Sequence, residues 1–285
     1  MQNLRDIRRR IKSVESTKQI TKAMEMVSAA KLRRAQMRVE SARPYSEKLI
    51  QILQSLAGAA DIAHPLFEKR EVKNTAIVMM AGDRGLCGSF NQNVIRAGEI
   101  LMAEHDPDDI QLVLVGKKLI DYFKRRRWNM RLTYTDFIGN MDLQRMIDIA
   151  RDVVELFLTR EVDAVKLIYT RFVSTTIYRV TVEDFLPIAK PEGDEAGTSA
   201  DYIFEPDSET IYADILPRFI QNRIYMSFAE SLASEHGARM MAMSNATKNA
   251  KEMIDNLTLL RNKVRQASIT SELLEIVGGA EALKG

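Results

Sequence analysis

The 285-residue sequence is poor in several residue types, and each shortage excludes a class of protein. A single cysteine, Cys87, excludes an internal disulfide and leaves no cysteine cluster for a structural zinc site. The histidines, His64, His105 and His236, lie far apart without acidic or cysteine partners at ligand spacing, so we expect no metal site. No run of about eighteen apolar residues occurs, so we expect no direct membrane insertion.

An excess of one charge is also missing from the chain as a whole. Forty-one Lys and Arg residues against thirty-nine Asp and Glu leave a formal charge of +2, which does not favour a polybasic nucleic-acid binder. The sequence contains no G-x-S-x-G, no H-E-x-x-H and no distinctive carboxylate pair. We therefore expect no catalytic residues and no cofactor.

Glycine and proline are nearly absent from the N-terminal segment. Between Asn3 and Ala57 there is no glycine, and Pro44 is the only proline, which predicts one very long helix bent at Pro44. Its apolar residues recur at threes and fours, which predicts one buried face: Leu4, Ile7, Ile11, Val14, Ile20, Met24, Val27, Leu49, Ile52, Leu53 and Leu56.

The C-terminal segment has the same character. From Asp207 or Ser208, either of which could cap a helix, only one proline and one glycine interrupt a helical pattern up to Val277. About seventy helical residues extend roughly 100 Å, more than a globular domain of this chain could contain. The expected seam is rich in small residues: Met240, Met243, Thr247, Ala250, Ile254, Leu257 and Val264. We expect the two terminal helices to pair as a long antiparallel coiled coil.

The middle of the chain alternates short apolar runs with amphipathic helices. The pattern predicts strands over 75–81, 110–115, 130–134, 164–172 and 176–187, helices over 92–104, 117–126 and 142–158, and a loop over 189–200. Such alternation indicates βαβ units and a largely parallel sheet. The predicted fold is therefore α/β: a coiled coil of residues 1–58 and 208–285, with an inserted Rossmann-like domain over 74–200.

The sharpest local motif is the glycine-rich turn from Gly82 to Gly88, between a predicted strand and a helix. Phosphates bind at such places, but the spacing G-x-x-G-x-x-G is neither the dinucleotide fingerprint nor the P-loop. The alternative is a turn whose glycines let the backbone approach another element closely. Cys87, at the expected start of a helix, could have a lowered thiol pKa there.

The N-terminal helix carries a local basic excess. Residues 1–43 contain twelve Lys and Arg residues and four Asp and Glu residues. Such a helix favours anionic surroundings, so it is a solvated face, binds an acidic protein, or binds nucleic acid. The first aromatic residue is Tyr45, so the basic part offers no platform on which bases could stack.

Near the C-terminus, Gly278, Gly279 and Ala280 end the last helix. Each glycine lowers helix propensity by about 1 kcal/mol, so this end is either frayed or held in a narrow collar where larger side chains would collide.

Three motifs along the whole chain resemble the gamma subunit family of F-type ATP synthases. The N-terminal run Thr17–Ser28 and the central Asp83–Gly88 resemble it in order. The family's C-terminal pattern, Ile-Thr-x-Glu, an acid, then Gly-Ala and a small residue, is matched by Ile269, Thr270, Glu272, Glu275, Gly279, Ala280 and Ala282.

The resemblance implies a central-stalk rotor that couples ion-driven rotation of a membrane ring to ATP synthesis or hydrolysis in the beta subunits. It implies that the coiled coil lies inside a hexamer of alpha and beta subunits, and that the α/β domain is a foot against epsilon and the c-subunit ring. It further implies beta-subunit contacts at Met24, Arg33, Arg34, Arg265, Gln266 and Thr270, and epsilon or ring contacts at Tyr202 and Glu205.

The resemblance also bears on location and regulation. The sequence has no dithiol insertion like that of chloroplast relatives, which favours a bacterial protein at the cytoplasmic face of the cell membrane, peripheral, within the ATP synthase complex. The alternative function is a basic coiled coil that binds nucleic acid. A nucleotide-binding α/β enzyme, suggested by the glycine-rich turn, is a third hypothesis.

Overall fold

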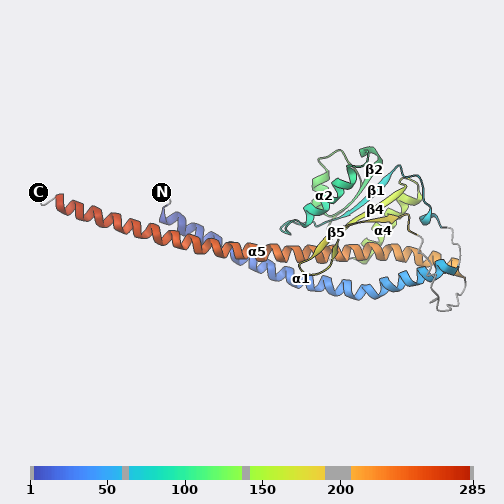
Figure 1. Cartoon of the computed structure of the whole chain (residues 1–285), viewed down its shortest axis with the longest axis horizontal. Helices are drawn as coiled ribbons and strands as arrows, with labels where there is room; N and C mark the ends of the chain where they lie inside the picture. The colour runs from blue at the N-terminus through green and yellow to red at the C-terminus, as the bar shows by residue number, and fades with distance from the viewer. Residues whose placement is uncertain (1–2, 60–63, 137–141, 190–206, 283–285) are drawn as a thin grey trace. The chain divides into compact units, whose positions relative to one another are not determined.

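The computed structural model describes residues 3–59, 64–136, 142–189 and 207–282 (Figure 1). The chain divides into two compact units, residues 1–28 with 240–285, and residues 29–239. Each unit contains part of both long helices, α1 (Leu4–Ala59) and α5 (Ser208–Ala282). The two predicted terminal helices are therefore present, and α5 includes Gly278, Gly279 and Ala280, which were expected at its end.

The buried face of α1 differs from the predicted one at two positions. Ile20 and Val27 are 57% and 56% exposed, whereas the neighbouring Thr21 and Ser28 are buried. The prediction was wrong here because the small side chains of Thr and Ser let the two helices approach closely. Their hydroxyl groups can be buried because they hydrogen-bond to carbonyls of their own helix. The Ser28 hydroxyl, for example, donates to the carbonyl of Met24 at 2.7 Å.

The N-terminus of α5 is capped by Asp207, one of the two residues proposed from the sequence. Its carboxylate accepts a hydrogen bond from the Thr210 backbone N–H at 2.8 Å, which satisfies a donor that the first helical turn leaves free. Pro217 and Gly237 both lie inside the helix without ending it.

The two long helices are antiparallel, as predicted. Within residues 29–239, the Asn222 amide donates to the Ser46 hydroxyl at 2.5 Å. Further along α5, a Cβ on Gly237 would lie 3.9 Å from the side chain of Leu32. Positions therefore rise along one helix as they fall along the other.

A five-stranded sheet lies between the two helices in the sequence, with spatial order β3-β2-β1-β4-β5. Its strands are β1 Thr75–Met80, β2 Ile110–Val115, β3 Asn129–Tyr134, β4 Ala164–Phe172 and β5 Tyr178–Leu186. Strands β1 to β4 are parallel and β5 pairs with β4 in the antiparallel sense, so the predicted largely parallel sheet is confirmed. The bounds of β2 and β4 are those predicted.

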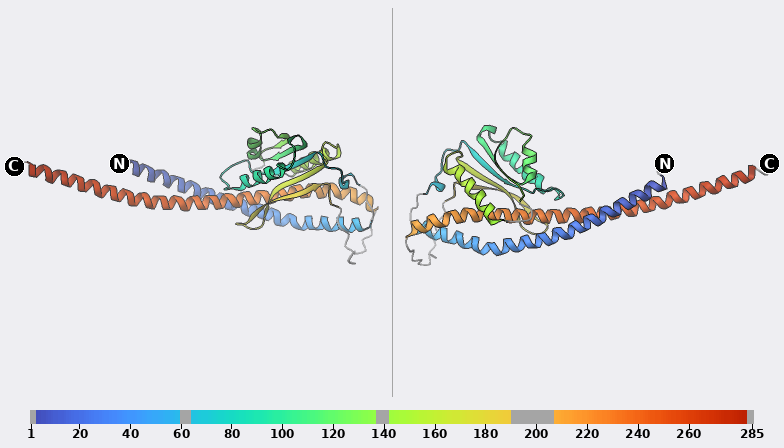
Figure 2. Two further views of the ribbon diagram at one scale, coloured as in Figure 1. Left: turned by 45° about the horizontal axis from the view of Figure 1, so that its top comes forward. Right: turned by 180° about the vertical axis from the view of Figure 1, so that it is seen from behind.

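Helices cover both faces of this sheet (Figures 1 and 2). The intervening helices are α2 Phe90–Met102, α3 Lys117–Phe123 and α4 Leu143–Leu158, with short 3₁₀ turns η1 Pro65–Phe67 and η2 Pro107–Asp109. Apolar residues of α2 and α3 form the core on one face. The core on the other face combines α4, the end of α1 and α5.

The contribution of α5 to the sheet core was not predicted. Its buried apolar residues recur every four positions and form a ridge against the sheet: Tyr212, Leu216, Ile220, Ile224, Phe228 and Leu232. Full burial of each large apolar side chain stabilises the fold by about 1.5–3 kcal/mol. The C-terminal helix is therefore a layer of the α/β fold as well as a member of the helix pair. The expected loop over 189–200 lies mostly outside the described residues.

Candidate partner-binding surfaces

The helix pair of residues 1–28 and 240–285 has a seam of small and polar side chains. The Thr21 and Thr247 hydroxyls lie 2.8 Å apart, and that of Thr247 also donates to the carbonyl of Met243. Met243 and Ala250 are buried, as the predicted seam of α5 requires. A polar pair of this kind in a helix seam favours one register of pairing.

The predicted contacts on α1 are accessible to different degrees. Met24 is half-buried, and it belongs to the unit of residues 1–28 and 240–285. Arg33 and Arg34 are exposed and belong to the other unit. The two arginines therefore offer charge to an external partner, whereas Met24 offers only part of its side chain.

The predicted contacts on α5 form an exposed group. Arg265, Gln266 and Thr270 are all exposed and lie on consecutive turns. The Thr270 hydroxyl donates to the Gln266 carbonyl at 2.9 Å, within its own helix. The side chains of Arg265 and Gln266 are thus the more available polar groups for a partner.

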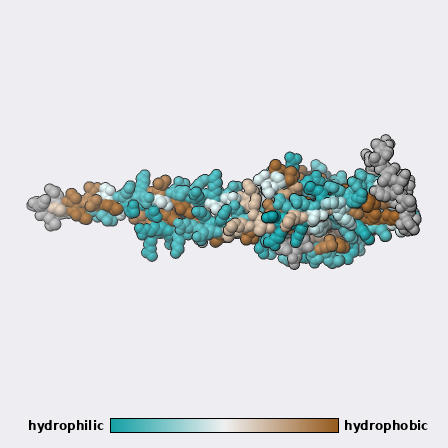
Figure 3. Space-filling model, turned by 90° about the horizontal axis from the view of Figure 1, so that it is seen from below, coloured by the Kyte–Doolittle hydropathy of each residue, from teal (hydrophilic) through white to brown (hydrophobic). Residues whose placement is uncertain are grey.

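Beyond these residues α5 exposes a cluster of large apolar side chains. Five of them are 49–67% exposed: Ile269, Leu273, Leu274, Ile276 and Val277. Figure 3 shows brown, hydrophobic residues gathered next to the grey C-terminal end. Monomeric proteins rarely expose large contiguous apolar patches, so this end of α5 has the composition of a protein-binding surface. The sequence analysis named Ile269 as part of the C-terminal motif but did not predict an exposed apolar cluster here.

The predicted epsilon or ring contacts, Tyr202 and Glu205, lie outside the described residues.

The glycine-rich turn packs against α5. A Cβ added to Gly82 would lie 2.8 Å from the carboxyl carbon of Glu235 on α5, so a side chain at this position would have to displace the Glu235 carboxylate. Arg239 donates from its Nη2 atom to the carbonyl of Gly85 at 3.2 Å. Of the two interpretations of the turn, the structure favours close backbone approach over phosphate binding.

Cys87 is buried, and the expectation of a lowered thiol pKa was wrong. Burial raises its pKa, an effect that Arg239 opposes only in part. The carboxamide of Asn91 donates to the Cys87 sulfur at 3.2 Å and to the Arg84 carbonyl at 3.2 Å. The thiol therefore serves as a packed side chain within the turn.

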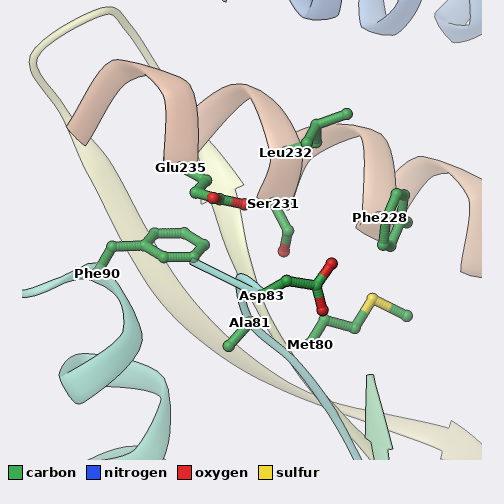
Figure 4. A pocket seen from close by; sticks show the side chains of 8 residues that line it. All are labelled: Met80, Ala81, Asp83, Phe90, Phe228, Ser231, Leu232 and Glu235. Carbon is green, nitrogen blue, oxygen red and sulfur yellow. The ribbon is translucent and has the colours of Figure 1, made fainter. Parts of the chain in front are cut away.

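A small cavity of about 10 Å³ lies where α5 crosses the end of β1. It is lined by Met80, Ala81, Asp83, Phe90, Phe228, Ser231, Leu232 and Glu235, and Figure 4 shows Ser231 and Glu235 on α5 directed toward the end of β1. The space is enough for about one water molecule and is far too small for a nucleotide.

Three titratable residues on this part of α5 are buried, which the sequence analysis did not predict. Glu235 and Arg239 are 3% and 9% exposed and form an ion pair at 2.6 Å. His236 is 5% exposed, and burial lowers its pKa to about 4, with further lowering by Arg239, Lys31 and Arg34. The only signal in the sequence is the mixture of small and charged residues in the middle of a long helix.

Within residues 3–59, 64–136, 142–189 and 207–282, no group of three or more His, Cys, Asp or Glu side chains could hold a metal ion. Over the same ranges, none of the helices combines the length and the apolar character needed to cross a membrane.

Comparison with known proteins gives consistent matches along the whole chain. A family profile described as "ATP synthase" matches residues 3–283. The ATP synthase gamma chain of Pelotomaculum thermopropionicum is 46% identical over 285 residues, and that of Moorella thermoacetica 47% over 285 residues, each match covering all of both chains.

Solved structures share the fold. A chain of the Euglena gracilis mitochondrial ATP synthase (OSCP/F1/c-ring, rotational state 3) has a TM-score of 0.72 at 24% identity, covering 98% of this chain and 94% of that one. A chain of the Tetrahymena thermophila mitochondrial ATP synthase (central stalk/c-ring) has a TM-score of 0.60 at 24% identity, covering 80% and 99%.

These matches do not support the nucleic-acid-binding alternative. High identity over the full length, rather than over one segment, means that the long helices and the α/β fold are shared together. The chain belongs to the ATP synthase gamma chain family.

Proposed function

We propose that this chain is the central-stalk rotor subunit of an F-type ATP synthase. In this role it couples ion-driven rotation of a membrane ring to ATP synthesis or hydrolysis in the beta subunits. The observation that carries the proposal is the identity to gamma chains of 46–47% over all of both chains.

We infer that catalysis takes place on other subunits. The turn of this chain that could have held a phosphate is filled from α5 by Glu235 and Arg239. The cavity beside it has room for about one water molecule. The chain then acts on the beta subunits mechanically, by contacting them differently as it turns, since a conformational change requires differential interaction with the two states.

The basic part of α1 is the proposed contact with acidic regions of the beta subunits. Arg33 and Arg34 are exposed there, and Met24 is half-buried on the same helix. Exposed ion pairs contribute only about 0–1 kcal/mol each, so contacts of this kind bias the beta subunits without trapping the rotor.

The exposed end of α5 is the second proposed beta-subunit surface. Arg265, Gln266 and Thr270 would meet a beta-subunit loop, and the adjacent apolar cluster supports insertion of this end among partner subunits.

The remaining assignments follow from family membership. We propose that residues 1–58 and 208–285 form the shaft and residues 74–200 the foot, with Tyr202 and Glu205 contacting epsilon or the c-subunit ring. The complex would lie at the cytoplasmic face of a bacterial cell membrane.

Purification of the tagged chain from native membranes tests the central proposal. The rotor function requires that the chain elute with alpha, beta, epsilon and c subunits, and that the complex hydrolyse ATP while the chain alone does not. Elution as a free protein, or ATPase activity of the chain alone, would contradict it.

Charge reversal tests the basic surface separately. The double variant Arg33→Glu/Arg34→Glu should reduce coupled ATP synthesis in the reconstituted complex and change its dependence on salt. The matched control is Arg125→Glu/Arg127→Glu, which reverses two exposed arginines of the α/β fold. Equal effects of the two double variants would refute a specific contact at Arg33 and Arg34.

A further inference from the structure

The hydrogen bonding of β4 is completed by a helix. Strand β1 pairs with β4 only as far as Met79 and Ile168, because β1 then turns away into the glycine-rich turn. Two residues further along β4, the backbone N–H of Thr170 donates to the Ser231 hydroxyl at 3.0 Å. The Ser234 hydroxyl donates to the Thr170 carbonyl at 3.2 Å. Two side chains of α5 thus take the place of a neighbouring strand.

Both hydrogen bonds are buried, so losing either one would lower the stability of the fold substantially. Thr170 and Ser234 are fully buried and Ser231 is nearly so. A buried backbone N–H or carbonyl left without a partner costs its full desolvation energy, so each serine has a specific structural task. Serine is also a mediocre residue for the middle of a helix, and two of them three positions apart on one face need such a reason.

The next turns of α5 contact two further parts of the α/β fold. Arg239, paired with Glu235, donates to the carbonyl of Gly85 in the turn after β1. A Cβ on Gly237 would lie 3.3 Å from the carbonyl oxygen of Thr175, in the connection between β4 and β5. Residues 231–239 of α5 are therefore hydrogen-bonded to β4 and to the turn after β1, and they pass close to the connection that follows β4.

These polar contacts differ in kind from the apolar ridge at residues 212–232. Apolar burial is non-directional, so a ridge repeated every four residues can be satisfied again after a helix shifts or rotates in its groove. Hydrogen bonds from two side chains to one backbone residue, and an arginine held to one carbonyl, permit a single rotation of the helix about its axis.

We propose that residues 231–239 of α5 form the joint through which the α/β fold turns this helix, with Ser231, Ser234 and Arg239 as positioning residues that prevent it from slipping. The proposal rests on the rotor function proposed above. The apolar ridge supplies stability to this joint, and the polar contacts supply its resistance to torque.

The test uses the complete enzyme reconstituted in vesicles, in which ATP hydrolysis and ATP-driven ion pumping are measured together. For Ser231→Ala/Ser234→Ala we expect hydrolysis to be retained while the ions pumped per ATP fall by about threefold or more, because two of the directional contacts are gone. The loss should grow as an opposing ion gradient is raised, since slipping increases with load.

Ser227→Ala is the matched control. Ser227 is buried on the same helix, but its hydroxyl donates to the Arg223 carbonyl within α5. This variant should pump as many ions per ATP as the wild type. If the double variant does not assemble into the complete enzyme, the single variants Ser231→Ala and Ser234→Ala are compared with the same control.

The outcomes separate the joint from the rotor function. The proposed joint would be refuted if every serine variant that assembles pumped as many ions per ATP as Ser227→Ala. It would also be refuted if ATP hydrolysis and ion pumping fell in the same proportion. Failure of the wild-type chain to assemble with the other subunits would overturn the rotor function instead.

Discussion

Two stretches of the same helix, α5, differ completely in burial. Between residues 227 and 239, α5 is buried on nearly every side, and its polar groups are tied to the sheet and its turns. Between residues 269 and 280 every residue is exposed, including several large apolar ones. Continuous helical structure therefore says little about what a segment does. The first stretch is stabilised by its own chain, and the second has the surface of a segment that a partner covers.

The largest expected contrast is between two leucines on α5. Leu216 is fully buried in the sheet core, whereas Leu274 is 67% exposed. Leu216→Ala should lower the free energy of unfolding by about 2–5 kcal/mol, because it removes packed methyl groups and leaves a cavity. Leu274→Ala should change it by less than about 0.5 kcal/mol.

Urea unfolding of the full chain measures both effects. The single tryptophan, Trp128, packs against the core of α2 and α3, so its fluorescence reports the α/β fold. Equal losses for the two leucine variants would show that the two stretches are not distinguished by burial.

The second contrast is in pH dependence and centres on His236. Its folded-state pKa of about 4 lies below the ordinary value, because of burial first and then the nearby Arg239, Lys31 and Arg34. The unfolded chain therefore binds a proton at higher pH than the folded chain does. The associated stability is present above about pH 6.5 and is lost as the pH falls toward 4, amounting to about 3 kcal/mol.

His236→Gln isolates this contribution, since glutamine does not titrate. Between pH 7 and pH 4 the wild type should lose about 3 kcal/mol more unfolding free energy than the variant. Parallel pH profiles for the two proteins would mean that the folded chain accommodates a protonated His236.

The third contrast concerns two glycines of one turn. Gly82→Ala should lower the unfolding free energy by about 1–3 kcal/mol, because the new methyl group would collide with the Glu235 carboxylate, which Arg239 holds in place. At Gly85 the closest atom to an added Cβ, on Lys118, is 4.0 Å away, so Gly85→Ala is the matched control. If Gly82→Ala were as stable as Gly85→Ala, the turn would not be held against α5.

The sequence predicted the elements well because their signals are local. Strand β2 was predicted at its observed bounds from its short, mostly apolar run, and Asp207 was one of two residues predicted to cap α5, from their position before a helical pattern. The buried face of α1 was wrong at Ile20 and Val27, because burial there depends on the other helix, as the contact between Thr21 and Thr247 shows, and no local pattern contains that helix.

The attachment of α5 to the sheet could not be predicted for the same reason. In the sequence, Ser231 and Ser234 are simply two weak helix formers. Their role becomes visible only in the fold, which brings Thr170, far away in the sequence, within hydrogen-bonding distance of both. Among the predicted contacts, Arg33, Arg34, Arg265 and Gln266 are accessible as the resemblance required, but their partners are on other chains. The assignment of those contacts stays a prediction.

The smallest expected effect is at the exposed end of α5, where an added Cβ at Gly278 or Gly279 would meet nothing within 4 Å. In the isolated chain Gly278→Ala/Gly279→Ala should favour the helix by about 0.5–1 kcal/mol per residue and raise helicity in circular dichroism, with urea unfolding of the α/β fold unchanged. In the assembled enzyme the same variant should slow ATP hydrolysis, because the added methyl groups meet a surrounding collar. A gain of helicity with no change in the assembled enzyme would show that these glycines mark only a frayed terminus.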